Sequence, residues 1–290
     1  MRFVFYNNSA YLKKPSAATL GDSEWIPLDE IVKDSRRGDY DINSTSFYSL
    51  FNEISDLLHG NDLVGANAVK LDSDSKFDSV SASPRQIIAV GINYVDHAEE
   101  MNMEVSDSPV VFTKFQSCIA GANAIVELPN ETVDYENELT VVIGKFCSNV
   151  SIDNALDYVA GVTVGEDISD RTLQFAAGSH FSLGKSYHNF GPIGPELVTL
   201  DEIGSLEDLY IKTWLNGELV QDSSTSQMIF KVDYLVSYLS SVIDLYPGDV
   251  IFTGSPAGVG FSRRPPLYLR PGDILESEIE KVTKQTIYFR

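Results

Sequence analysis

The chain of 290 residues has little cysteine and few basic residues, and each shortage excludes a class of protein. Two cysteines, Cys118 and Cys147, are too few for a disulfide framework, and neither stands in a spacing typical of zinc sites. Lysine and arginine number 21 against 42 acidic residues, so the formal net charge is −21. That charge disfavours nucleic acids and anionic membrane surfaces as partners, and a small anionic substrate would need local cations.

Long hydrophobic runs are also missing. No stretch approaches the roughly 18 apolar residues of a membrane-spanning helix, and the apolar run in residues 1–6 is too short for a secretory signal. The hydrophobic share of 43% is ordinary for a globular protein. We therefore expect a globular cytoplasmic protein with no membrane or nucleic-acid partner.

Two parts of the chain differ in their pattern of apolar and polar residues. We expect residues 1–80 to form a small N-terminal α/β domain with a helix near residues 47–58. Residues 81–290 are expected to form a second, larger domain after a Ser- and Pro-containing boundary. Short apolar runs there predict a β-rich, α+β fold, with strands near residues 86–91, 110–115, 124–129, 139–143, 158–164, 209–215, 250–253 and 286–289. Helices are expected from residue 95, at 151–157 and 171–176, and, with an apolar stripe, at 231–243.

A pair of glutamates opens one of the apolar runs. Glu136 and Glu138 are two residues apart, so in a strand they share one face. Two like charges held this close repel each other, and burial of either is costly. A hard divalent cation would relieve both problems. The alternative is a solvated strand face, and spacing alone does not decide between the two.

Polar residues also gather after other apolar runs. A helix from Val95 would bring His97 and Glu100 within one turn, which can make a general base or be an incidental surface pair. Asp167 follows a strand, where site residues are common, and Arg171 suits a carboxylate. Lys185 could balance carboxylates or be solvated.

The glycine-rich segment after residue 252 could hold a substrate carboxylate through its backbone N–H groups and hydroxyls, or be only a turn. Its candidate residues are Thr253, Gly254 and Ser255.

Taken together, these segments resemble the fumarylacetoacetate hydrolase family, in the family's order, over about residues 84–290. The segments are Gly91-x-Asn93-Tyr94-x-x-His97-x-x-Glu100, Tyr135-Glu136-x-Glu138-Leu139, Asp167-Ile168-Ser169-x-Arg171-x-x-Gln174, Gly184-Lys185-Ser186, Gly191-Pro192-x-Gly194-Pro195, Asn216-Gly217-Glu218 and Thr253-Gly254-x-Pro256-x-Gly258-Val259-Gly260.

The resemblance implies a mixed β-sandwich or roll, usually homodimeric, with a magnesium or manganese site in which calcium could substitute in a crystal. The implied site residues are the metal ligands Glu136, Glu138 and Asp167, the acid–base pair His97 and Glu100 on a mobile lid helix, the active-site Lys185, and the substrate-facing Arg171, Gln174, Tyr94, Thr253, Gly254 and Ser255. The chain departs from the family at His188, at Ser255 in place of threonine, and at Phe115-Gln116, positions that bear on the substrate more than on the metal.

The resemblance implies chemistry through a pyruvate-type enolate of a small anionic 2-oxo acid. We favour hydrolysis of a C–C bond in an acylpyruvate-type acid, with oxaloacetate decarboxylation, or isomerisation or hydration of related 2-oxo acids, on the same site as alternatives. A different class also stays open, a catalytically weak regulatory protein with a structural metal.

Overall fold

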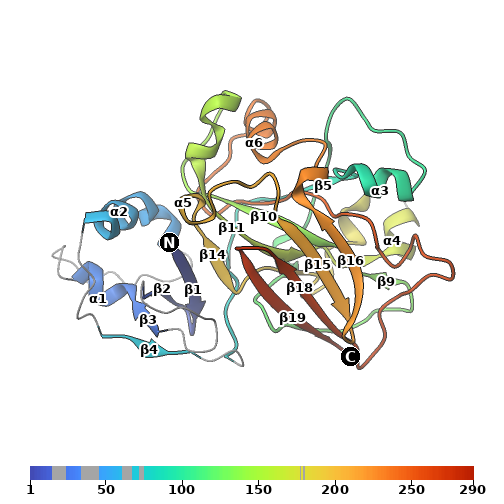
Figure 1. Ribbon diagram of the computed structural model, residues 1–290, viewed down its shortest axis with the longest axis horizontal. Helices are drawn as coiled ribbons and strands as arrows, with labels where there is room; N and C mark the ends of the chain where they lie inside the picture. Colours follow the sequence, from blue (N-terminus) through green and yellow to red (C-terminus); the bar gives the residue numbers. More distant parts are fainter. Residues whose placement is uncertain (15–23, 34–45, 61–66, 72–74, 177, 179) are drawn as a thin grey trace.

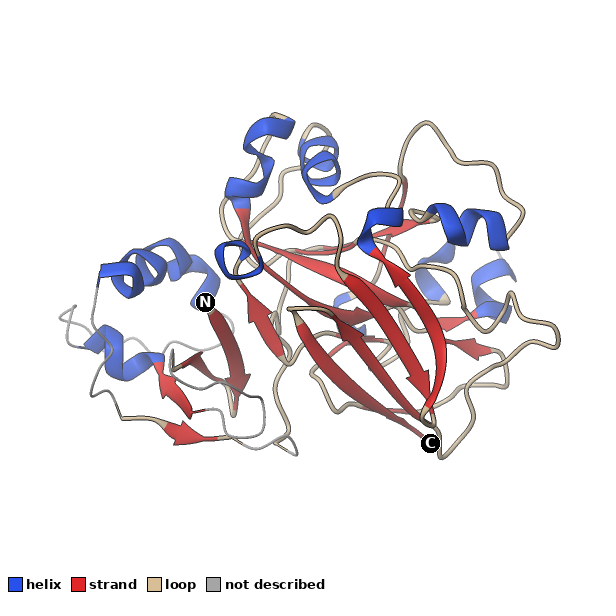
Figure 2. Cartoon of the chain, in the orientation of Figure 1, coloured by secondary structure: helices blue, strands red, loops and turns tan. Residues whose placement is uncertain are grey.

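The computed structural model describes residues 1–14, 24–33, 46–60, 67–71, 75–176, 178 and 180–290. Within these residues, most strands belong to two sheets (Figures 1 and 2). The larger sheet has ten strands in the order β4 (Val69–Lys70), β3 (Glu24–Pro27), β2 (Ser9–Lys13), β1 (Arg2–Tyr6), β14 (Glu196–Val198), β11 (Val159–Glu166), β10 (Asn137–Ile143), β17 (Val250–Phe252), β5 (Ile87–Gly91) and β6 (Val110–Thr113).

The smaller sheet has five strands in the described residues, in the order β16 (Glu218–Ser224), β15 (Tyr210–Leu215), β18 (Ile274–Ile279), β19 (Thr283–Phe289) and β8 (Ile125–Val126). It packs across β10 and β11 of the larger sheet. Two strand pairs complete the described sheets, β12 (Ser169–Asp170) with β9 (Val133–Asp134), and β13 (Gly191–Pro192) with β7 (Ile119–Ala120).

Helices lie around these sheets (Figure 2). The α-helices are α1 (Leu28–Lys33), α2 (Phe47–Gly60), α3 (Val95–Glu100), α4 (Arg171–Ala176), α5 (Leu200–Ile203) and α6 (Val232–Ser240), and the 3₁₀ turns are η2 (Gln116–Cys118), η3 (Ile152–Tyr158), η4 (Phe181–Leu183) and η5 (Thr225–Gln227). Helix α6 is shorter than predicted at both ends, whereas α4 has the predicted bounds. No helix among the described residues is long and apolar enough to cross a membrane.

The strands of the first 80 residues extend the larger sheet. β1 pairs antiparallel with β14, placing Phe3 opposite Leu197. Phe3 and Phe5 pack edge-on against Phe47 of α2, with ring centroids 5.1 Å apart in both pairs. The N-terminal strands and α2 lie together at the left of Figure 1. The domain boundary near residue 80 stays a prediction.

Strand β10 is buried along its whole length because it is covered on both faces. Leu139, Val141 and Ile143 belong to a core that includes Ile211 and Ile279 of the smaller sheet. Successive side chains of a strand alternate between faces, so even-numbered residues point the other way. The candidate active site described below lies on that second face of β10.

Candidate active site

Glu136 lies immediately before β10, and Glu138 is its second residue. Both side chains line a cavity of about 110 Å³. Asn137 between them faces the smaller sheet, where its Nδ2 donates to the carbonyl of Lys212 at 2.9 Å. The two glutamates therefore share a face, as their spacing predicted, and the solvated-face alternative is wrong because Glu136 is 7% and Glu138 1% exposed.

Asp167 adds a third carboxylate. It follows β11, and its backbone N–H donates to the carbonyl of Glu136 at 2.9 Å, which continues the pairing of the two strands. Asp167 is fully buried, and one carboxylate oxygen from each of the three residues lies within 4.8 Å of the others. Clustered carboxylate oxygens are the ligands that hard divalent cations take. The donor set therefore fits magnesium or manganese.

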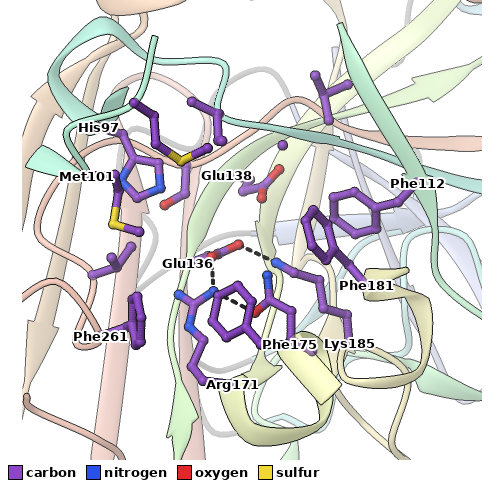
Figure 3. Close-up of a pocket in the computed structure, with 17 residues that line it drawn as sticks. His97, Met101, Phe112, Glu136, Glu138, Arg171, Phe175, Phe181, Lys185 and Phe261 are labelled. Atoms are coloured by element: carbon purple, nitrogen blue, oxygen red, sulfur yellow. Dashed lines mark hydrogen bonds and ion pairs between the residues drawn. The ribbon is translucent and has the colours of Figure 1, made fainter. Parts of the chain in front are cut away.

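Two buried lysines neutralise part of this charge. Lys185 Nζ lies 2.6 Å from Glu136 Oε2 (Figure 3). It also lies 2.6 Å from Asp167 Oδ2. Lys114 Nζ lies 2.5 Å from Asp167 Oδ1 and also donates to the carbonyls of Lys185 and Phe190. Burial alone would lower the pKa of Lys185, but the charges of Asp167 and Glu136 raise it, so this ammonium stays protonated.

The two glutamates differ in how far neighbouring positive charges offset their negative charge. Burial would raise the pKa of Glu136, but the charges of Lys185 and Arg171 lower it to about 2. Burial raises the pKa of Glu138 well above its usual range, and the charges of Asp167 and Glu136 add to the effect. Glu138 Oε2 accepts the N–H of Gly254 at 2.6 Å. Of the two glutamates, Glu138 is thus the one whose negative charge a bound cation would compensate more.

Arg171, the first residue of α4, holds the opposite side of Glu136. Its Nη1 lies 2.8 Å from Glu136 Oε1 and donates to Gln174 Oε1 at 2.9 Å (Figure 3). Its Nε and Nη2 donate to Asp134 Oδ2 at 2.9 and 2.6 Å. Asp134 is fully buried and also accepts the N–H groups of Gly260 and Phe261. It therefore fixes the guanidinium against Glu136.

Helix α3 places His97 at the cavity, as the sequence predicted (Figure 3). Its Nδ1 lies 3.4 Å from Glu100 Oε2. Glu100 also accepts the N–H of Gly258 at 3.1 Å. Burial would raise the pKa of Glu100, but hydrogen bonds from His97, Ser262 and Gly258 outweigh it and lower the pKa. The ionised Glu100 can only accept hydrogen bonds, so the His97 proton belongs on Nδ1 and Nε2 is left as the basic nitrogen.

Of the residues predicted to contact substrate, Arg171, Gln174 and Ser255 line the cavity, whereas Tyr94, Thr253 and Gly254 lie outside its lining. Thr253 Oγ1 donates to the carbonyl of Leu139 at 2.7 Å. Tyr94 is fully buried, and its hydroxyl has no hydrogen-bond partner among the described residues. Substrate contacts by these three residues stay predictions.

The sequence did not identify three parts of the site. Lys114 gave no signal within the strand-like run that contains it. Asp134 precedes Glu136 by two residues, and that repeated spacing could have singled it out. An apolar wall of four phenylalanines and two methionines also lines the cavity (Figure 3), built from Met101, Met103, Phe112, Phe175, Phe181 and Phe261. Such a wall excludes water, which strengthens electrostatic interactions inside.

Comparison with known proteins identifies the family. Residues 86–287 match the model described as fumarylacetoacetate (FAA) hydrolase C-terminal. A fumarylacetoacetate hydrolase domain-containing protein 2 homolog of Dictyostelium discoideum is 47% identical over 69% of this chain and 69% of its own length. Oxaloacetate tautomerase Fahd2a of Rattus norvegicus, named as mitochondrial, is 44% identical over 69% of this chain but only 64% of its own length.

Solved structures agree over the whole chain. A Mycobacterium smegmatis protein is 40% identical with a TM-score of 0.87, and covers 100% of this chain and 99% of its own. Fumarylacetoacetate hydrolase from Exiguobacterium antarcticum is 28% identical with a TM-score of 0.82 and the same coverage. The predicted β-rich α+β fold is thereby confirmed. The buried carboxylates, the lysine between them and these matches agree, and the chain belongs to the fumarylacetoacetate hydrolase family.

Proposed function

We propose that this protein is a divalent-metal-dependent enzyme that interconverts the keto and enol forms of oxaloacetate. The observation that carries the proposal is the buried cluster of Glu136, Glu138 and Asp167, with Lys185 between two of them, beside a cavity that both glutamates line. The named activity of the rat relative supports oxaloacetate as the substrate. We therefore favour keto–enol tautomerisation, one of the isomerisations that the sequence left open, over C–C hydrolysis.

The three carboxylates would hold magnesium or manganese. A divalent cation, when bound, supplies Lewis-acid stabilisation of the negative charge that develops on a keto oxygen. The chain's own part is to bring three acidic side chains together and to restrain them. Lys185 and Lys114 hold Asp167, Arg171 and Lys185 hold Glu136, and the Gly254 N–H holds Glu138.

Proton transfer falls to His97 in this proposal. Its Nε2 would take the proton from the carbon next to the keto group, while Glu100 stabilises the imidazolium through Nδ1. The protonated Lys185 would stabilise the enolate charge, and return of the proton from His97 Nε2 to the oxygen would complete the enol and regenerate the base. The 3.4 Å separation of His97 and Glu100 is long for a hydrogen bond, which is common before substrate binds.

Hydrolysis of an acylpyruvate-type acid is the second candidate, because the His97–Glu100 pair can serve that reaction as well. The same base can deprotonate a water that attacks the distal carbonyl, after which C–C cleavage releases the enolate. Decarboxylation of oxaloacetate would need no such water. A panel of oxaloacetate, acetylpyruvate and fumarylpyruvate therefore separates the candidates.

The deciding experiment follows the decay of enol-oxaloacetate in the ultraviolet with magnesium or manganese present. Wild-type protein and Glu131→Gln, a change at an exposed glutamate near the site, should accelerate the decay, whereas Glu138→Gln should not. Full activity of Glu138→Gln, or activity that survives exhaustive chelation, would refute the metal-dependent proposal. Failure of the wild-type protein on every substrate would favour the regulatory alternative.

The homodimer that the family resemblance implies is also part of the proposal, and the mass of the protein measured by analytical ultracentrifugation would test it.

A further inference from the structure

A buried glutamine outside the cavity lining is hydrogen-bonded to a hydroxyl group that lines the cavity. Gln221 lies on β16 and is 1% exposed. Its side chain reaches from the smaller sheet toward the loop after β17, where Nε2 lies 2.9 Å from Ser255 Oγ. Ser255 is 4% exposed and lines the cavity, whereas Gln221 does not.

The hydrogen bonds of Gln221 fix which way its amide points. Its Oε1 accepts the backbone N–H of Asn137 at 3.2 Å and the hydroxyl of Thr213 at 3.0 Å. A backbone N–H can only donate, so the atom facing Asn137 is the oxygen. The other end faces the carbonyl of Pro256 at 3.1 Å, which can only accept, so that atom is the NH₂ group. All four hydrogen-bonding positions of the amide are used.

This orientation determines the role of the Ser255 hydroxyl. Because the NH₂ group of Gln221 can only donate, Ser255 Oγ must accept from it, and its own proton must go elsewhere. Among the described residues, the acceptor for the Ser255 hydroxyl proton is the carbonyl oxygen of Pro256, which lies 3.5 Å from Ser255 Oγ. That separation is at the limit of a hydrogen bond, and the carbonyl already accepts from Gln221.

We infer that Gln221 is a positioning residue that makes the Ser255 hydroxyl a hydrogen-bond donor to an anionic oxygen bound in the cavity. The inference rests on the proposed function only in taking that oxygen to belong to a 2-oxo acid or its enolate. A donor already oriented toward developing charge needs no reorientation when the substrate binds. Gln221 acts through Ser255 and touches no reacting atom.

Binding of oxalate, a planar mimic of the pyruvate enolate, tests the inference by calorimetry with the manganese-loaded protein. Ser255→Ala should bind oxalate about 10- to 100-fold more weakly, the loss expected for one hydrogen bond to a charged group. Ser255→Thr keeps the hydroxyl and should stay within about 3-fold of wild type, well inside that loss. Thr213→Val removes a hydrogen bond from the far side of Gln221 and should also leave oxalate affinity near wild type.

Gln221→Glu is the decisive variant. It keeps the oxygen that Asn137 and Thr213 require but replaces the group facing Ser255 with an acceptor, so the hydroxyl turns away from the cavity. We expect a loss as large as that of Ser255→Ala, and no further loss when both changes are combined, because Gln221 acts through Ser255.

Losses that add in the double variant, or wild-type affinity in Gln221→Glu, would overturn the inference. If Gln221→Glu does not fold, Gln221→Met replaces it, and its loss must likewise vanish in the Ser255→Ala background. Failure of the wild-type protein to bind oxalate overturns the proposed function instead, so the two failures are distinguishable.

Discussion

The ion pair between Asp134 and Arg171 is buried, and its removal has a large expected effect. Asp134 accepts five hydrogen bonds at 2.6–2.9 Å, two from Arg171 and one each from the N–H groups of Tyr135, Gly260 and Phe261. Asp134→Asn keeps the shape but places an NH₂ group against some of these donors in either orientation. It also leaves the buried guanidinium with less compensating charge.

Breaking a buried ion pair from one side costs about 3–5 kcal/mol. If the free energy of unfolding falls by about 3 kcal/mol per molar of urea, Asp134→Asn should lower the urea concentration at the unfolding midpoint by roughly 1–1.7 M. Tryptophan fluorescence during urea titration measures it.

Glu127→Gln is the matched control, because Arg290 Nη2 lies 2.6 Å from Glu127 Oε1, the same separation as between Arg171 Nη2 and Asp134 Oδ2. That pair is exposed, so its loss should cost less than about 1 kcal/mol. Equal effects of the two substitutions would refute the reasoning, since burial is the difference between the pairs.

Three further outcomes test other parts of the structure. Lys114→Met should lower the free energy of unfolding by about 3–5 kcal/mol, measured with urea, because Asp167 loses a buried ion-pair partner; a change below 1 kcal/mol would contradict this. Burial raises the pKa of the Cys118 and Cys147 thiols, so DTNB should label neither in the native protein and both after unfolding. His97→Ala should lower kcat for tautomerisation by about 10²–10⁴-fold with unchanged manganese affinity; weaker manganese binding would instead make His97 part of the metal site.

Local sequence patterns predicted the parts of the site that depend on local geometry. The two-residue spacing of Glu136 and Glu138 places them on one face because strand side chains alternate. His97 and Glu100 meet because three residues make about one helical turn. Asp167 needed the ordered family pattern, since it is brought to the glutamates only by the pairing of β10 with β11.

The rest depends on long-range packing that local patterns do not contain. Lys114 reaches Asp167 across 53 positions of sequence. β16 and β18 were not predicted. In β18 every second residue is buried, but the residues between them include two glutamates, so the run has no continuous apolar stretch. The pairing of β1 with β14 was hidden as well, since it joins residues almost 200 positions apart.

Manganese binding to chelator-treated protein, followed by calorimetry, tests whether Glu136, Glu138 and Asp167 form a metal site. We expect one ion per chain for the wild type and for Glu131→Gln, and no binding by Glu138→Ala, although that variant should fold because it removes a buried carboxylate that lies beside two others. Saturation of folded Glu138→Ala with one manganese ion at wild-type affinity would show that the three carboxylates are not the metal site.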